Sequence, residues 1–243
     1  DLADYPFNSY YYNTIEIGGH YSYNDLNSVF FAKKGAKFEA KLSRSLANQL
    51  DVNYTGGLVE NISGETNGYT KMSLNFEKRI PLKKKITGIV GATTNFIFED
   101  KLQSDQFSFA EYGYGAKYFI GGTAIGPTTN RTVFQGLNED ELVVTQFMKI
   151  NLALQYNVTG KIYLTPHVDF ASVGFGDFDD YFEDAFAPKG KWQDRTEASF
   201  LMSAGANLSY LSILGPITFD VSWLNDMDKI NLYFGIGFMF NPS

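Results

Sequence analysis

The C-terminal residues alternate between large apolar side chains and polar or small ones over an unusually long stretch. From Lys229 to Phe240 every even position is apolar, whereas the odd positions hold mainly Asn, Tyr and Gly. A period of two is that of a β-strand, which turns successive side chains to opposite faces. A face that stays apolar over about ten residues matches a tilted strand that crosses a bilayer. A strand of a water-soluble sandwich also alternates, so this segment alone leaves both architectures open.

The same alternation recurs along the whole chain. It is found in residues 10–23, 36–58, 69–80, 86–98, 143–156, 160–170, 198–211 and 215–224. Segment 36–58 keeps one parity throughout, which predicts either one very long strand or a hairpin around 44–48. Because aromatic residues gather at the strand ends, as in the interfacial girdles of membrane proteins, we expect an all-β fold, a transmembrane antiparallel β-barrel with about nine to eleven strands in this chain. Residues 1–9 are expected to be a lead-in, and 10–243 the barrel domain.

The predicted connections fall into a short class and a long class. Segments 81–85, 157–160 and 212–215 are short, whereas 59–68, 99–142 and 174–196 are long. Outer-membrane barrels have short periplasmic turns and long external loops. The short class is therefore predicted to lie on the periplasmic side.

Composition excludes several classes of function. The chain has no cysteine, which excludes disulfides, thiolate metal sites and cysteine nucleophiles. Its net charge of -7 argues against a nucleic-acid partner. Its basic run Lys83-Lys84-Lys85 is interpreted as a solvated turn. No stretch has the roughly 18–20 apolar residues of a transmembrane helix. No signal-peptide pattern opens the chain, so in an exported protein these residues are expected to be mature or internal ones.

Candidate ligand-binding residues are few. Segment 174–195 has six carboxylates that could hold Ca²⁺, but their spacing is not that of an EF-hand, and a solvated loop is the preferred interpretation. These are Asp177, Asp179, Asp180, Glu183, Asp184 and Asp194. His20 and His167 lie on predicted lumen faces without a third ligand, so we predict no metal site and no cofactor. Glu16, Lys149 and Lys161 also face the lumen and predict a polar network there.

Several motifs then point to a known family. The stretch Tyr118-Phe119-Ile120-Gly121-Gly122, followed by Thr132-Val133-Phe134-Gln135-Gly136-Leu137, resembles the sixth external loop of the BamA-type superfamily of outer-membrane assembly and translocation barrels. Four further stretches agree with the family in order: Tyr23-Asn24-Asp25-Leu26 with Lys34-Gly35, Leu154-Gln155-Tyr156, Val168-Asp169-Phe170-Ala171, and Leu214-Gly215-Pro216-Ile217 before the terminal strand. The resemblance covers roughly residues 20–240.

The resemblance implies a set of lumenal residues. In the family this loop folds back into the lumen, so Phe134, Gln135, Gly136 and Leu137 are expected to form the lumenal loop motif. The family's lumenal Arg falls on Gln135 and its Glu partner on Gln155, so both charges are replaced together. The resemblance thus implies Gln155 and Asp169 as lumen partners of Gln135; alternatively, Gln135 lies in a mobile loop.

The resemblance also implies a terminal signal and a cellular location. The last strand ends on an aromatic residue, as the family's insertion signal does, which assigns that signal to Phe234, Gly237, Phe238 and Phe240. The family's barrel has about sixteen strands, so this chain would be the C-terminal part of such a barrel. The implied location is the bacterial outer membrane. The implied partners are outer-membrane lipid and lipopolysaccharide, the assembly machinery during biogenesis, and a fused or partner polypeptide.

The ending of the chain looks closest to the C-terminal barrel of patatin-like phospholipase outer-membrane proteins. No G-x-S-x-G nucleophile elbow occurs, so we predict no catalytic residues and no enzyme activity in this chain, with any hydrolase domain lying outside it. The leading hypothesis is a barrel that anchors, and translocates or inserts, a polypeptide. The alternatives are an insertase or two-partner transporter barrel, a small passive porin-like barrel, and a barrel enzyme.

Overall fold

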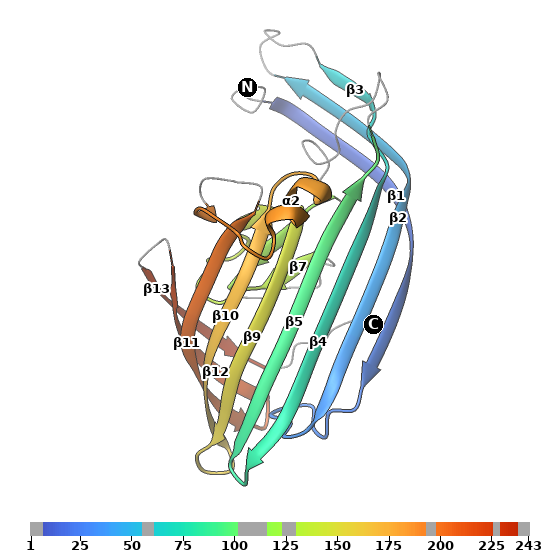
Figure 1. Cartoon of the computed structure of the whole chain (residues 1–243). Coiled ribbons are helices and arrows are strands. Elements are labelled where there is room, and N and C mark those ends of the chain that lie inside the picture. The colour runs from blue at the N-terminus through green and yellow to red at the C-terminus, as the bar shows by residue number, and fades with distance from the viewer. Residues whose placement is uncertain are drawn as a thin grey trace.

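A computed structural model describes residues 7–54, 61–101, 116–122, 130–192, 198–225 and 229–237 (Figure 1). Its strands are β1 (Phe7–Asn24), β2 (Gly35–Tyr54), β3 (Ile62–Glu65), β4 (Tyr69–Lys83), β5 (Ile86–Glu99), β6 (Tyr118–Gly121), β7 (Arg131–Val133), β8 (Leu142–Val144), β9 (Gln146–Asn157), β10 (Ile162–Gly174), β11 (Ser199–Ser212), β12 (Gly215–Leu224) and β13 (Lys229–Ile236). One short helix, α2 (Phe178–Asp184), follows β10. None of the helical segments within these ranges has the length and apolar character needed to cross a membrane.

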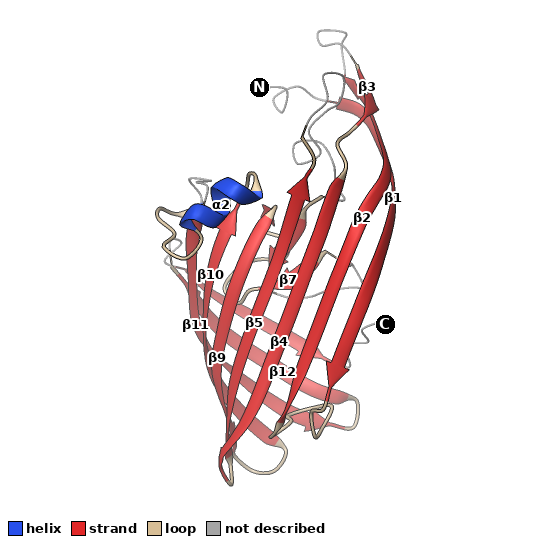
Figure 2. Ribbon diagram, turned by 45° about the vertical axis from the view of Figure 1, so that its right-hand side comes forward, coloured by secondary structure: helices blue, strands red, loops and turns tan. Residues whose placement is uncertain are grey.

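Most of the strands form one ten-stranded sheet. Its order is β1-β2-β4-β5-β9-β10-β11-β12-β13, with β3 added beside β2, and all its pairs are antiparallel. The predicted all-β antiparallel fold is therefore confirmed. The sheet curves strongly, and a second sheet of three strands, ordered β7-β6-β8, lies within the curve (Figure 2). Along the path β1 to β13, the two end strands each pair on one side only among the described residues.

The apolar face of each long strand points to the outside of the curve. On β13, Ile230 is 65% exposed and Leu232 is 64% exposed, whereas Asn231 between them is 8% exposed. The same holds for Leu152 and Leu154 on β9, which are exposed, and Gln155, which is buried. In a soluble sandwich the apolar face would form the core, so this arrangement fits a sheet whose outer face meets lipid.

The structure also resolves details that the sequence left open. Segment 36–58 contributes one long strand, β2, and no hairpin at 44–48. β1 begins at Phe7, inside the expected lead-in 1–9. The acidic segment 174–196 contains the helix α2, which the alternation did not predict, and the ring of Phe178 packs 5.1 Å from that of Phe96 on β5.

Candidate functional site

Strand β10 passes through three layers of side chains on the inner face of the sheet. Near its start Tyr163 is buried, His167 and Asp169 follow in the middle, and Val173 is buried near the end. Each layer receives a different partner from elsewhere in the chain. The layer at Tyr163 receives residues 25–34, which we call the turn strap. The layer at His167 and Asp169 is the polar belt. The layer at Val173 receives residues 116–122 and 130–145, which we call the lumenal loop.

The lumenal loop forms the small inner sheet. β6 is its central strand, with β7 parallel on one side and β8 antiparallel on the other. Its side chains Tyr118, Ile120, Phe134 and Leu137 are buried together with residues of the surrounding wall, in the largest apolar cluster of the described residues. The loop is thus packed against the inner wall with the burial of a protein core.

The loop is tied to β13 through its backbone. The Gly136 amide donates to the Tyr233 hydroxyl at 2.9 Å, and that hydroxyl donates to the Leu137 carbonyl at 2.6 Å. The Asn231 side chain donates to the Gly136 carbonyl. Gly136 has φ of +99°, and a Cβ there would lie 3.0 Å from the Cβ of Leu224. A left-handed backbone this close to β12 explains the glycine, since other residues are strained in that conformation.

Hydrogen bonds from the opposite wall hold the same loop. Lys149 on β9 donates from Nζ to the Val133 carbonyl at 2.7 Å. Asn95 on β5 donates to the Thr132 hydroxyl, also at 2.7 Å. The loop therefore bridges the inside of the curve from β5 and β9 to β13.

The polar belt is a chain of partnered groups centred on Asp169. Its carboxylate accepts from Asn151 at 3.0 Å and lies 3.2 Å from Nδ1 of His167. Lys149 lies 3.8 Å away, and Nε2 of His167 lies 3.1 Å from Asp220. Buried charges are tolerated when they are paired in this way.

Ser222 on β12 joins the polar belt at Asp220. Ser222 donates its hydroxyl to Asp220 and not to His167. The belt thus extends from β9 through β10 to β12 as one network of partnered polar groups.

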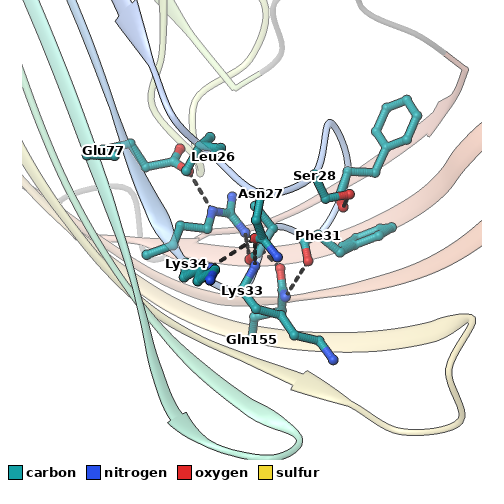
Figure 3. A network of polar contacts seen from close by, with 12 residues as sticks. Leu26, Asn27, Ser28, Phe31, Lys33, Lys34, Glu77 and Gln155 are labelled. Carbon is teal, nitrogen blue, oxygen red and sulfur yellow. Dashed lines mark hydrogen bonds and ion pairs between the residues drawn. The ribbon is translucent and has the colours of Figure 1, made fainter.

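The turn strap crosses the inside of the sheet at its short-turn end (Figure 3). Gln155 accepts from Nη1 of Arg79 at 2.8 Å and donates to the Phe31 carbonyl at 3.3 Å. Arg79 also donates to the Ala32 carbonyl, and the Phe31 ring stacks on Tyr163 at 3.9 Å. The turn between β1 and β2 is thereby fixed to β4, β9 and β10.

The expected partners of Gln135 lie in separate layers. Gln155 belongs to the strap and Asp169 to the belt, and no hydrogen bond within the described ranges joins either to Gln135. The loop does lie inside the sheet, and the motif residues that are hydrogen-bonded there are Gly136 and Leu137, through Tyr233. The sequence carried a signal for this anchor, because Tyr233 and Asn231 occupy the odd, inward positions of the terminal strand.

The structure describes only some of the residues predicted for the terminal signal and for the acidic segment 174–195. Phe234 points outward and is exposed, and Gly237 has φ of +110°. Phe238, Phe240 and Asp194 lie outside the described residues. Where the structure describes the chain, no group of three or more His, Asp or Glu side chains is arranged so that it could hold a metal ion.

Comparisons with known proteins agree with this architecture. A model of the Omp85 superfamily domain matches residues 8–240. The crystal structure of BamA from Haemophilus ducreyi lacking POTRA domains 1-3 is similar with a TM-score of 0.58 and 16% identity. That match covers 90% of this chain and 41% of the BamA chain, so the present chain spans less than half of that relative. No match was found among curated proteins.

Proposed function

The chain belongs to the Omp85 superfamily, and on that premise we propose that it is a bacterial outer-membrane barrel that anchors, and translocates or inserts, another polypeptide. Its partners in this proposal are outer-membrane lipid with lipopolysaccharide, the assembly machinery during biogenesis, and a client or fused polypeptide. The exposed apolar faces of the long strands support the membrane location, because such faces are stable in lipid and not in water.

One observation carries the proposed handling of a polypeptide: the lumenal loop is tied to β13. β13 is an end strand of the described sheet. In lipid, the backbone N–H and C=O groups along its open edge need a further strand as hydrogen-bonding partner. A polypeptide that pairs at this edge would lie beside Tyr233 and Asn231, the residues that hold Gly136. Strand pairing at the edge and the position of the loop are thereby coupled through two side chains.

A packed loop also distinguishes this proposal from a passive porin. Phe134 and Leu137 are buried among wall residues, and Lys149 fixes the neighbouring carbonyl of Val133. A porin keeps a polar, water-filled lumen, whereas here the loop has to move before a chain can pass.

The test is a reconstituted folding reaction. The chain is placed in phospholipid vesicles, an unfolded outer-membrane barrel of about eight strands is added, and its folding is followed by heat-modifiable gel mobility. We expect faster folding than in empty vesicles, and a changed rate with Tyr233→Phe but not with the outward Tyr210→Phe. Equal rates with and without the protein, together with a large steady ion conductance, would instead identify a passive pore.

The finer assignment that we propose is the barrel part of a patatin-like phospholipase. It is supported by the resemblance of residues 212–216 and 233–240 to the ends of those barrels. We further propose that this chain has no catalysis of its own. The whole gene product should then hydrolyse phospholipid while the isolated chain is inactive; hydrolysis by the isolated chain would overturn the assignment of chemistry to another domain.

A further inference from the structure

Four turns connect the strands at one end of the sheet, and taken together they are basic. They are residues 25–34, 84–85, 157–161 and 212–215, and the structure describes all of them. They contain Lys33, Lys34, Lys84, Lys85 and Lys161, with Lys83 at the end of β4. Their one carboxylate is Asp25. This concentration of positive charge contrasts with the net charge of -7 of the chain.

Three of these turns form one continuous edge, at the lower end of the sheet in Figure 1. The Asn157 amide donates to the Lys85 carbonyl at 2.9 Å, and the Leu211 amide donates to the Lys161 carbonyl at 2.8 Å. Turn 84–85 is thus joined to 157–161, and 157–161 to the turn that follows β11. We call Lys83, Lys84, Lys85 and Lys161 on this edge the basic rim.

The charges of the basic rim are not neutralised within the described chain. All four side chains are exposed, and none forms an ion pair with a described residue. Lys85 donates to the uncharged Val158 carbonyl at 3.3 Å. The carboxylate of Asp25 accepts from the Ala36 amide and the Tyr23 hydroxyl. The rim is therefore available to an external anion.

Apolar side chains on the same edge indicate what kind of anion this is. Ile213 is 100% exposed and Leu214 is 72% exposed, at the tip of the turn next to Lys161. Leu82, beside Lys83, is exposed on the outward face. An acidic protein in solution would not account for these exposed apolar side chains. The boundary between the headgroups and the acyl chains of a bilayer accommodates both the lysine and the apolar side chains.

We infer that the basic rim binds the headgroups of anionic phospholipids, of the phosphatidylglycerol class, in the leaflet at the short-turn end. The ammonium groups lie at headgroup level while Leu82, Ile213 and Leu214 enter the acyl region. This inference rests on the proposed function, because it requires that the sheet spans a membrane. A lysine near an anionic surface contributes about a fivefold factor in binding.

The test compares two lipids, and it compares two triple variants that each remove three lysine charges. The full chain in detergent is titrated with phosphatidylglycerol or with phosphatidylcholine, and bound lipid is measured by native mass spectrometry. We expect phosphatidylglycerol to bind at least tenfold more tightly. The triple variant Lys83→Gln, Lys84→Gln, Lys85→Gln should lose at least tenfold of that affinity, and adding Lys161→Gln should lower it further. The triple variant Lys101→Gln, Lys189→Gln, Lys191→Gln removes equal charge at the other end and should bind within twofold of the wild type.

Three results would overturn the inference. These are equal affinity for the two lipids, equal losses in the two triple variants, or binding of soluble polyglutamate without any lipid preference, which would indicate an acidic protein partner. Protease protection of the same protein in vesicles separates this failure from that of the proposed function. A chain that inserts but shows no preference refutes the lipid site alone, whereas a chain that does not insert refutes both.

Discussion

Replacing Tyr233 by phenylalanine removes one oxygen atom and with it two of the hydrogen bonds that hold the lumenal loop on β13. The hydroxyl accepts from the Gly136 amide at 2.9 Å and donates to the Leu137 carbonyl at 2.6 Å. Both loop residues are buried, so water does not readily replace the lost partner. The aromatic ring remains, and the apolar packing of β13 is unchanged.

The expected cost follows from these two bonds. A hydrogen bond contributes about 1 kcal/mol net, and a buried group left without a partner costs about 1–3 kcal/mol. The free energy of opening the loop should therefore fall by about 2–4 kcal/mol in Tyr233→Phe. At the lower end this accelerates hydrogen exchange of the Gly136 amide by about 30-fold.

Hydrogen exchange of the reconstituted protein measures this directly, because the Gly136 amide is itself the donor. Tyr210→Phe is the matched control, since Tyr210 is exposed on the outward face of β11. It should leave exchange at Gly136 unchanged. Exchange within twofold of the wild type in Tyr233→Phe, or an equal change in both variants, would refute the proposed tether.

Three further predictions test other parts of the molecule. Gly136→Ala places a methyl group 3.0 Å from a β12 side chain on a backbone with φ of +99°, and should lower the free energy of unfolding in urea by about 2–4 kcal/mol. Gly160→Ala, with φ of +81° and open space around it, should cost only the backbone strain, and equal losses would contradict the close packing. Lys149→Met removes a hydrogen bond to the loop and a partner of Asp169, and should cost about 2–3 kcal/mol; an unchanged urea midpoint would argue against this anchor. The hydrogen bond from the Ala36 amide lowers the pKa of Asp25 below its usual value of about 4. The turn that begins at Asp25 should therefore stay ordered above about pH 4 and lose its order as the pH falls through the lowered pKa of this carboxyl. An acid titration followed by NMR should show this loss, and Asp25→Asn should abolish the pH dependence of the turn.

The orientation of the strands could be predicted because it depends on local pattern alone. Ile230 and Leu232 share a parity, and that parity decides which face they occupy wherever the strand is placed. The continuity of β2 was harder to predict, since a long run of one parity fits a hairpin as well as a single strand. The structure settles this through pairing of β2 with β1 along nearly its full length.

The contacts of the interior could not be predicted because they join distant segments, often through the backbone. Gln155 is bonded to the Phe31 carbonyl, 124 residues away, and any residue type could have supplied that carbonyl. The contacts of Gly136 and Leu137 likewise use main-chain groups, which do not depend on the residue type and so cannot be predicted from the sequence. Tyr233 is the partner in that contact that the sequence could indicate, since a tyrosine on the inward face of the terminal strand needs a partner for its hydroxyl.

The tether between the loop and β13 also sets an order of events during folding. Its two hydrogen bonds join residues 97 and 96 positions apart, and β13 is the last strand of the described sheet. Contacts of such long range form late, because the intervening chain must first be ordered. The earlier strands can pair without these contacts, but the loop is not fixed until β13 is in place. The closed tether would then mark that the described sheet has been assembled as far as β13.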